Sequence, residues 1–215
     1  SEQMEKKSAL TPEQELARFD DARIKAEKQL QGLYDKTLAE AGEEHAAIFE
    51  VHQMMLEDED YVDSAKEKID EGATAEYATA ATGEEFYELF DSMDDEYMKG
   101  RAADVKDISQ RVIGILTGVD EDAALEGMGD EPVILVAEDI APSDVLKLDK
   151  DKLLGFVTKR GSSSSHTAIL AGALGIPMLI GVEYDADWNG KFGVLDGYNN
   201  CLYIEPEGEL LASLQ

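Results

Sequence analysis

The chain has 215 residues, and its 48 Asp and Glu against 19 Lys and Arg give a formal net charge of −29 at pH 7. Such a surface repels nucleic acid and anionic membranes, so we expect neither as a partner and favour a basic protein instead. The alternative to a basic partner is that the acidic surface serves only solubility, or adaptation to a salty cytoplasm. No apolar run reaches the roughly 20 residues that span a bilayer, and the single cysteine, Cys201, rules out an internal disulfide, which fits a cytoplasmic protein.

The N-terminal part of the chain shows helical periodicity and little strand character. Thr11-Pro12-Glu13-Gln14 is a helix start with a threonine cap, a proline at the first helical position and a glutamine at the third. The acidic run at 57–60 either bends the second helix or forms its exposed end. We predict a helical bundle within a subdomain of residues 1–118, built from these segments: a long helix from 11 that Gly42 ends, a helix from about Glu43, an alanine-rich segment between Gly72 and Gly83, a short aromatic piece at 84–90, and a long helix from Asp94 to about Gly118.

A linker at residues 119–131 separates this part from a segment of α/β character at 132–215. Short apolar runs predict strands, and the segments between them predict helices. The expected strands are 132–137, 154–158, 177–182, 192–196 and 201–204, and the expected helices are 142–148, 168–174 and 207–215.

The stretch from Gly161 to Gly181 carries the strongest chemical signal. It places His166 on a strand-to-helix turn, where unpaired backbone N–H groups and the positive end of the helix dipole accommodate a phosphoryl group. The same dipole favours a neutral imidazole, the form that is a nucleophile. The hydroxyls of the run 162–165 and of Thr167 add hydrogen-bond donors. The alternative is a flexible turn in which Ser165 or Ser164 caps the helix and His166 is a surface residue.

The segment Gly161-Ser162-Ser163-Ser164-Ser165-His166-Thr167-Ala168-Ile169-Leu170-Ala171-Gly172, followed by Ile176-Pro177-Met178-Leu179-Ile180-Gly181, resembles the phosphohistidine swivelling domain of phosphoenolpyruvate-utilising enzymes. Ser162 in place of a glycine and Gly172 in place of an arginine depart from that pattern. Three further stretches, at 47–59, 95–108 and 132–143, resemble the N-terminal domain of Enzyme I of the bacterial sugar phosphotransferase system.

The resemblance implies a fold that combines α/β and all-α parts, in which a swivelling phosphohistidine β/α domain carries a helical-bundle insertion. It also implies that the first strand and the C-terminal phosphoenolpyruvate-binding barrel of the family are absent. The chain itself is then expected to hold no cofactor and no metal, with Mg²⁺ required by the full-length enzyme. Its own C-terminal domain would be a partner in the full-length protein, and the fragment is expected to be a monomer.

The resemblance further implies a phosphoenolpyruvate-protein phosphotransferase. His166 would accept a phosphoryl group originating from phosphoenolpyruvate and pass it to a histidine of the carrier HPr in sugar uptake. Thr158 would hydrogen-bond the active histidine, the alternative being an ordinary strand-end threonine. Arg101 would pair with the phosphoryl group, the alternative being an ion pair with Asp104 or Glu96. The residues expected around the phosphoryl group are Gly161, Ser164, Ser165 and Thr167.

The resemblance also implies an HPr-docking face on the second helix and the helix after it. Its expected members are an apolar set, His52, Met54 and Met55, and the acidic pair Glu43 and Glu44, which would face basic residues of HPr. We expect one of the two methionines to point inward and one outward. Alternatives are an HPr-docking module with weak or no transfer, a phosphohistidine domain of another phosphoenolpyruvate-utilising enzyme, and an acidic helical adaptor fused to a structural α/β domain.

Overall fold

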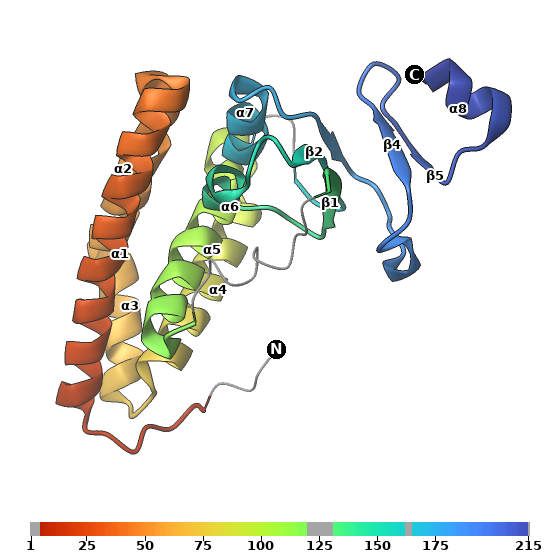
Figure 1. Cartoon of the computed structure of the whole chain (residues 1–215). Helices are drawn as coiled ribbons and strands as arrows, with labels where there is room; N and C mark the ends of the chain where they lie inside the picture. The colour runs from red at the N-terminus through yellow and green to blue at the C-terminus, as the bar shows by residue number, and fades with distance from the viewer. Residues whose placement is uncertain (1–4, 120–130, 162–164, 215) are drawn as a thin grey trace. The chain divides into compact units, whose positions relative to one another are not determined.

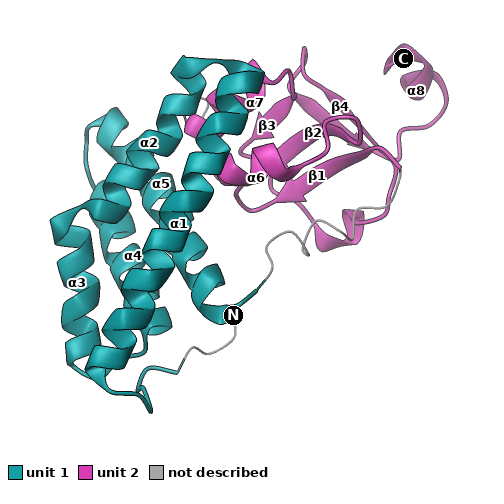
Figure 2. Ribbon diagram, turned by 60° about the vertical axis from the view of Figure 1, so that its left-hand side comes forward, with its two compact units in different colours: residues 1–124 teal, residues 125–215 magenta. Residues whose placement is uncertain are grey.

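The computed structural model describes residues 5–119, 131–161 and 165–214. The chain divides into two compact units, residues 1–124 and residues 125–215, coloured separately in Figure 2. We call them the helical unit and the α/β unit. Within the described ranges, no helix has the length and apolar character needed to cross a membrane.

The helical unit is a bundle of long helices lying side by side (Figure 1). Helix α1 packs against α2 and α5, α4 packs against α5, and α3 packs against α4. Its core is made of fully buried side chains such as Phe19, Leu30, Phe49 and Ile108, each of which contributes about 1.5–3 kcal/mol when buried. The helices are α1 (Pro12–Ala41), α2 (Glu43–Glu57), α3 (Glu59–Asp70), α4 (Ala75–Asp91) and α5 (Glu96–Thr117).

Local capping sets the ends of these helices. Thr11 and Gln14 form a capping box at the start of α1, which satisfies two backbone N–H groups that have no partner within the helix. Asp58 accepts a hydrogen bond from the Tyr61 N–H at 3.2 Å and caps α3. The acidic run at 57–60 therefore separates two helices, rather than bending one.

Helix α4 corrects the sequence analysis, which divided this region at Gly83. The helix continues through Gly83 to Asp91 because tertiary packing requires a glycine there. A Cβ atom at Gly83 would lie 2.5 Å from the Ser109 Oγ atom of α5. The glycine thus allows α4 and α5 to approach closely. The packing free energy of this contact outweighs the cost of a glycine in a helix interior, which is about 1 kcal/mol relative to alanine.

The α/β unit contains a parallel sheet of three strands in the order β1-β2-β3 and a separate antiparallel pair, β4 and β5. Each strand predicted in this part of the chain is present, with bounds that shift by no more than one or two residues. Its elements are β1 (Val133–Ala137), α6 (Pro142–Lys147), β2 (Leu153–Thr158), α7 (His166–Ala173), β3 (Met178–Ile180), the 3₁₀ helix η2 (Ala186–Trp188), β4 (Gly193–Asp196), β5 (Cys201–Ile204) and α8 (Gly208–Leu214).

Strand register brings the carboxyl ends of the three parallel strands together. Thr158 at the end of β2 lies opposite Ala137 of β1 and Ile180 of β3. The chain leaves β2 at this edge and returns as α7, so His166 follows the edge directly. Ligands of open α/β sheets bind at this kind of edge.

Gly155 on β2 offers a test of the packing in the α/β unit. A Cβ atom there would lie 2.9 Å from the Pro177 carbonyl oxygen and 2.5 Å from Leu195 Cδ2. We expect Gly155→Ala to lower the free energy of unfolding of this unit by about 1–3 kcal/mol, because overpacking forces the backbone to shift. Urea unfolding followed by the fluorescence of Trp188, the single tryptophan of the chain, measures the change.

Gly172→Ala is the matched control, because a Cβ atom at Gly172 meets nothing within 4 Å. This helical position should gain up to about 1 kcal/mol from the better propensity of alanine. Equal stability of the two variants would contradict the packing argument.

Candidate functional site

His166 is the first residue of α7, and Ser165 is its N-cap. The Ser165 Oγ atom accepts a hydrogen bond from the Ala168 N–H at 3.2 Å. The imidazole of His166 is half-buried and lies in the first turn of a helix, where the dipole favours anions. Because the Ser165 hydroxyl acts as an acceptor in the cap, its own hydrogen is still available to donate. Capping and anion binding are therefore compatible at this residue.

Thr158 ends β2 with a fully buried side chain. Its Oγ1 atom has no hydrogen-bond partner among the described residues. Gly161 comes close to this hydroxyl: a Cβ atom on Gly161 would lie 3.9 Å from Thr158 Oγ1. Gly161 has φ +116°, a conformation that L side chains rarely adopt, so only glycine fits well here. A buried hydroxyl without a partner costs about 1–3 kcal/mol, which makes Thr158 unusual for an ordinary strand end.

Thr167 does not lie where the sequence analysis expected it. The prediction that its hydroxyl faces a phosphoryl group is wrong, because Thr167 is buried and its Oγ1 donates to the Ile140 carbonyl at 2.8 Å. That bond uses the only hydrogen of the hydroxyl. Thr167 instead ties the start of α7 to the segment before α6. Ser164, another expected contact, lies outside the described residues.

Two cations next to Gly161 were not singled out from the sequence, although the basic pair Lys159-Arg160 immediately precedes it. Lys159 Nζ lies 2.9 Å from Glu183 Oε2, and this hydrogen bond raises the pKa of the lysine. Arg160 Nε lies 3.2 Å from Glu138 Oε1. Each cation is paired with a carboxylate, so neither presents an uncompensated charge to an anion.

Arg101 lies near the start of α5, in the helical unit. Its Nη2 donates to the Tyr97 hydroxyl at 3.3 Å, and its Cζ atom lies 5.2 Å from the centre of the Tyr97 ring. The alternative ion pair with Asp104 or Glu96 is not formed in the part of the chain that the structure describes. Arg101 is therefore held by an aromatic ring and not by a carboxylate.

His52 is a correction to the expected docking face. Its side chain is completely buried, so it is not available at the surface. Its Nε2 lies 3.0 Å from Asp104 Oδ1, its Nδ1 lies 3.8 Å from Asp107 Oδ2, and its ring packs edge-on against Phe49. The physical reason is helical spacing: His52 is four residues after Ile48, on the inward face of α2.

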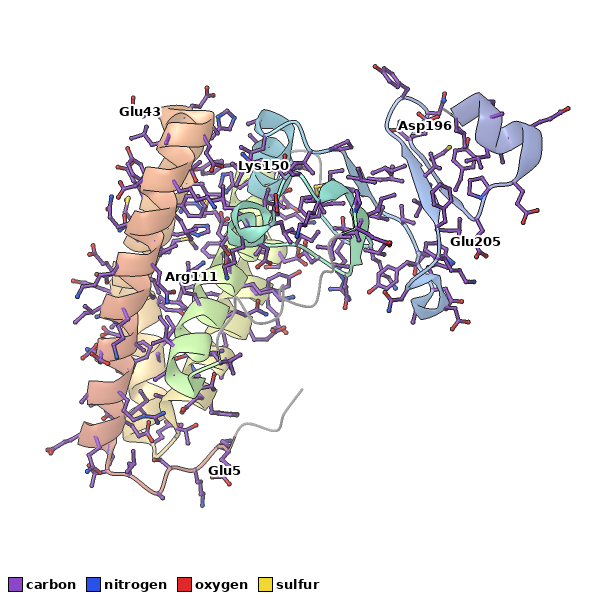
Figure 3. The ribbon with its side chains drawn as sticks, in the orientation of Figure 1. Glu5, Glu43, Arg111, Lys150, Asp196 and Glu205 are labelled. Atoms are coloured by element: carbon purple, nitrogen blue, oxygen red, sulfur yellow. The ribbon has the colours of Figure 1, made fainter. Side chains whose placement is uncertain are left out.

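The other expected docking residues lie on the outer side of α2. Met54 is 67% exposed, and Met55 is half-buried. Glu43 and Glu44 are exposed in the first turn of α2, where the helix dipole favours acidic residues. Figure 3 shows Glu43 at the end of the bundle where α2 begins. Four of the five expected residues thus retain some accessible surface.

No metal centre is evident in the described ranges, because no group of three or more His, Cys, Asp or Glu is arranged to hold an ion. The chemistry available at His166 is instead that of a nucleophilic imidazole at a helix N-terminus. A backbone anion site, a serine hydroxyl and a buried threonine hydroxyl accompany it. This set suits transfer of a group with high negative charge.

Comparisons with protein families and with relatives of known sequence agree with this chemistry. Residues 1–101 match the family described as PEP-utilising enzyme, N-terminal, and residues 129–200 match the PEP-utilising enzyme, mobile domain. The phosphoenolpyruvate-protein phosphotransferase of Bacillus subtilis (strain 168) is 38% identical over 209 residues, 96% of this chain and 36% of that protein. The one from Staphylococcus carnosus (strain TM300) is 34% identical over 207 residues, 94% of this chain and 35% of that protein. The chain thus spans little more than a third of these relatives.

Two solved structures are similar over almost all of this chain. A solution NMR structure of Enzyme I (nEIt) has a TM-score of 0.65 and 30% identity, and the match covers 98% of this chain and 85% of that one. A structure of the N-terminal domain of Enzyme 1 - Nitrogen has a TM-score of 0.63 and 30% identity, with coverages of 99% and 87%. They confirm the predicted fold class, a β/α domain combined with a helical bundle.

The buried position of His52 predicts a role in stability. We expect His52→Leu to lower the free energy of unfolding of the helical unit by about 1.5–3 kcal/mol, because it removes a buried hydrogen bond to a charged group. Far-UV circular dichroism during urea unfolding measures the change. Met54→Leu on the same helix is the control, and it should stay within about 0.5 kcal/mol because Met54 is exposed. A His52→Leu variant as stable as the parent would contradict this role.

Proposed function

This chain belongs to the Enzyme I family of phosphoenolpyruvate-utilising enzymes, and we propose that His166 is its phosphoryl carrier. The observation that carries the proposal is the position of His166, in the first turn of α7 at the carboxyl edge of the parallel sheet. In the whole protein His166 accepts a phosphoryl group that originates from phosphoenolpyruvate. It passes the group to a histidine of the phosphocarrier HPr, in the service of sugar uptake.

The transfer exchanges one bond to phosphorus for another. A neutral ring nitrogen of His166 attacks the phosphorus, a P–N bond forms, and the P–O bond of phosphoenolpyruvate breaks. The leaving group is the enolate of pyruvate, which takes up a proton and is released as pyruvate. In the next step a nitrogen of the HPr histidine attacks, and the P–N bond to His166 breaks. We assign the use of phosphoenolpyruvate, together with the Mg²⁺ expected for it, to the longer protein, because the chain spans little more than a third of its relatives.

The residues around His166 support positioning and charge stabilisation, the main needs of phosphoryl transfer. The Ser165 hydroxyl and the backbone N–H groups at the start of α7 would donate to the phosphoryl oxygens. Gly161 would allow the backbone to approach the group closely. The buried, unpaired hydroxyl of Thr158 supports a role in orienting the imidazole: by accepting the N–H of one ring nitrogen, it would leave the other nitrogen as the nucleophile.

We propose that HPr docks on the outer side of α2 and on the neighbouring α3. Met54 and Met55 provide the apolar contact, and Glu43 and Glu44 attract basic residues of the carrier. His52 is no longer part of this face, since it is buried. Arg101 would pair with the phosphoryl group of the docked carrier. The second candidate function, a docking module with weak transfer, rests on the departures Ser162 and Gly172 from the family pattern.

Labelling by phospho-HPr tests the carrier role. We expect the chain, mixed with phospho-HPr that intact Enzyme I and phosphoenolpyruvate have produced, to gain one acid-labile phosphoryl group by intact mass. His166→Ala should gain none, because the nucleophile is missing. His45→Ala is the matched control in the helical unit and should be labelled like the parent. Tight binding of HPr without any label would favour the docking module.

Charge reversal tests the docking face. We expect Glu43→Lys combined with Glu44→Lys to slow HPr association about tenfold or more at low salt, and less at high salt, because steering by exposed charges is screened. Stopped-flow measurements across a salt series check this.

The control for charge reversal is Glu207→Lys combined with Glu209→Lys. It changes the net charge of the chain by the same amount but at a different place, in the α/β unit. Both of these glutamates are exposed. An equal slowing by the control would assign the effect to net charge and remove Glu43 and Glu44 from the docking face.

A further inference from the structure

Arg101 differs from the other arginines of the chain in the group that its guanidinium contacts. Of the five arginines, three pair with carboxylates, and the buried Arg111 donates to the side-chain carbonyl of Gln29. Arg101 rests on the Tyr97 ring, with one hydrogen bond to the Tyr97 hydroxyl. The carboxylate pairs are Arg18 with Glu15 and Glu76, Arg23 with Asp20, and Arg160 with Glu138.

A tyrosine holds an arginine without neutralising it. The ring beneath the guanidinium restricts its rotamers, and the hydroxyl accepts one N–H, yet the positive charge is not cancelled as it would be by a carboxylate. One of the five guanidinium N–H donors is thereby used, and Nε has no hydrogen-bond partner in the described part of the chain. The donors that remain on the two terminal nitrogens, Nη1 and Nη2, keep the planar arrangement that suits the oxygens of a phosphoryl group. Tyr97 is 65% exposed, whereas Arg101 is half-buried and its Nε atom is buried.

The nearest acidic residues on α5 do not compete for Arg101. Asp104 is three residues along the helix, within reach of an i, i+3 pair, but it is buried and its Oδ1 lies 3.0 Å from His52 Nε2. Glu96 is five residues before Arg101, a spacing that does not bring two side chains together on a helix. Arg101 is thus held by a neutral aromatic ring, and not by a carboxylate or by an amide as Arg111 is.

We infer that Tyr97 is a positioning residue that presents the Arg101 guanidinium, with its charge intact, to the phosphoryl group of the incoming carrier. The inference rests on the proposed function, in which Arg101 meets the phosphorylated histidine of HPr. Tyr97 acts through Arg101 and makes no contact with the reacting atoms itself. Its removal should therefore slow transfer and leave the affinity for unphosphorylated HPr unchanged.

A double-mutant cycle tests the inference. Single-turnover transfer from phospho-HPr to His166 is measured by rapid quench for the parent, Tyr97→Phe, Tyr97→Leu, Arg101→Ala and the double variant. Tyr97→Phe keeps the ring and loses the hydroxyl, so we expect a rate about threefold lower, against about tenfold or more for Tyr97→Leu. In the Arg101→Ala background, Tyr97→Leu should have no further effect, because the group it positions is gone.

Two controls accompany the cycle. Tyr77→Leu removes another aromatic ring that lies beneath a cation, since Lys6 Nζ lies 5.4 Å from the Tyr77 ring centre, and its transfer rate should equal that of the parent. Calorimetric titration with unphosphorylated HPr should give the same affinity for Tyr97→Leu and the parent.

The results that contradict the role of Tyr97 can be told apart from those that contradict the role proposed for Arg101. If Arg101→Ala slows transfer and Tyr97→Leu does not, the inference fails and the proposed function stands. The inference also fails if Tyr97→Leu remains fully effective in the Arg101→Ala background, or if it weakens binding of unphosphorylated HPr, which would make Tyr97 a docking contact. If Arg101→Ala transfers at the parental rate, or if the parent takes no label, the part of the proposed function on which the inference rests fails with it.

Discussion

The hydrogen bond from the Ala168 N–H to the Ser165 hydroxyl decides where α7 begins. Because Ser165 takes the N-cap, His166 becomes the first helical residue, with unpaired N–H groups and the positive end of the dipole beside its ring. Thr167, one residue later, turns inward and donates to the Ile140 carbonyl. One helix terminus thus connects α7 to the segment before α6 and places His166, the proposed nucleophile, in the first turn of the helix.

Directional bonds also organise the interior of the helical unit. His52 of α2 and Tyr61 of α3 both reach α5, through Asp104 at 3.0 Å and Ser109 at 2.8 Å. Burial raises the pKa of Tyr61 to about 12, so this phenol keeps its proton in the bond to Ser109 even at pH values where an exposed tyrosine begins to ionise. Apolar contacts are non-directional, whereas buried hydrogen bonds favour one alignment of two helices. They set the position of α5 along the bundle and therefore the place of Arg101.

Strong acidity is a constraint on the proposed function, in which a chain with a net charge of −29 would bind a negatively charged group. The cations beside Gly161 are neutralised by carboxylates, as in the pairs Lys159 with Glu183 and Arg160 with Glu138. Under that proposal, positive charge for the phosphoryl group would have to come from groups that are not paired with carboxylates. The start of α7 would be one such source, since backbone N–H groups carry no countercharge, and Arg101, which rests on the neutral Tyr97 ring, would be another.

The sequence by itself determined the features that depend on neighbours along the chain. Caps and glycines mark the ends of α1 and α5, apolar runs mark the strands, and the turn before α7 places His166 at a helix start. The pair of Tyr97 and Arg101, one helical turn apart, could also have been found in this way. Such signals act within a few residues, so they persist whatever the rest of the chain does.

Tertiary structure alone decided the features that depend on distant residues. Gly83 stays helical because Ser109 of α5 lies against it, and His52 faces inward to Asp104. The Thr167 hydroxyl donates to the Ile140 carbonyl, and the Thr158 hydroxyl is buried without a hydrogen-bond partner among the described residues. The partner of a polar side chain is whichever group the fold brings within about 3 Å, and helical periodicity does not reveal which group that is.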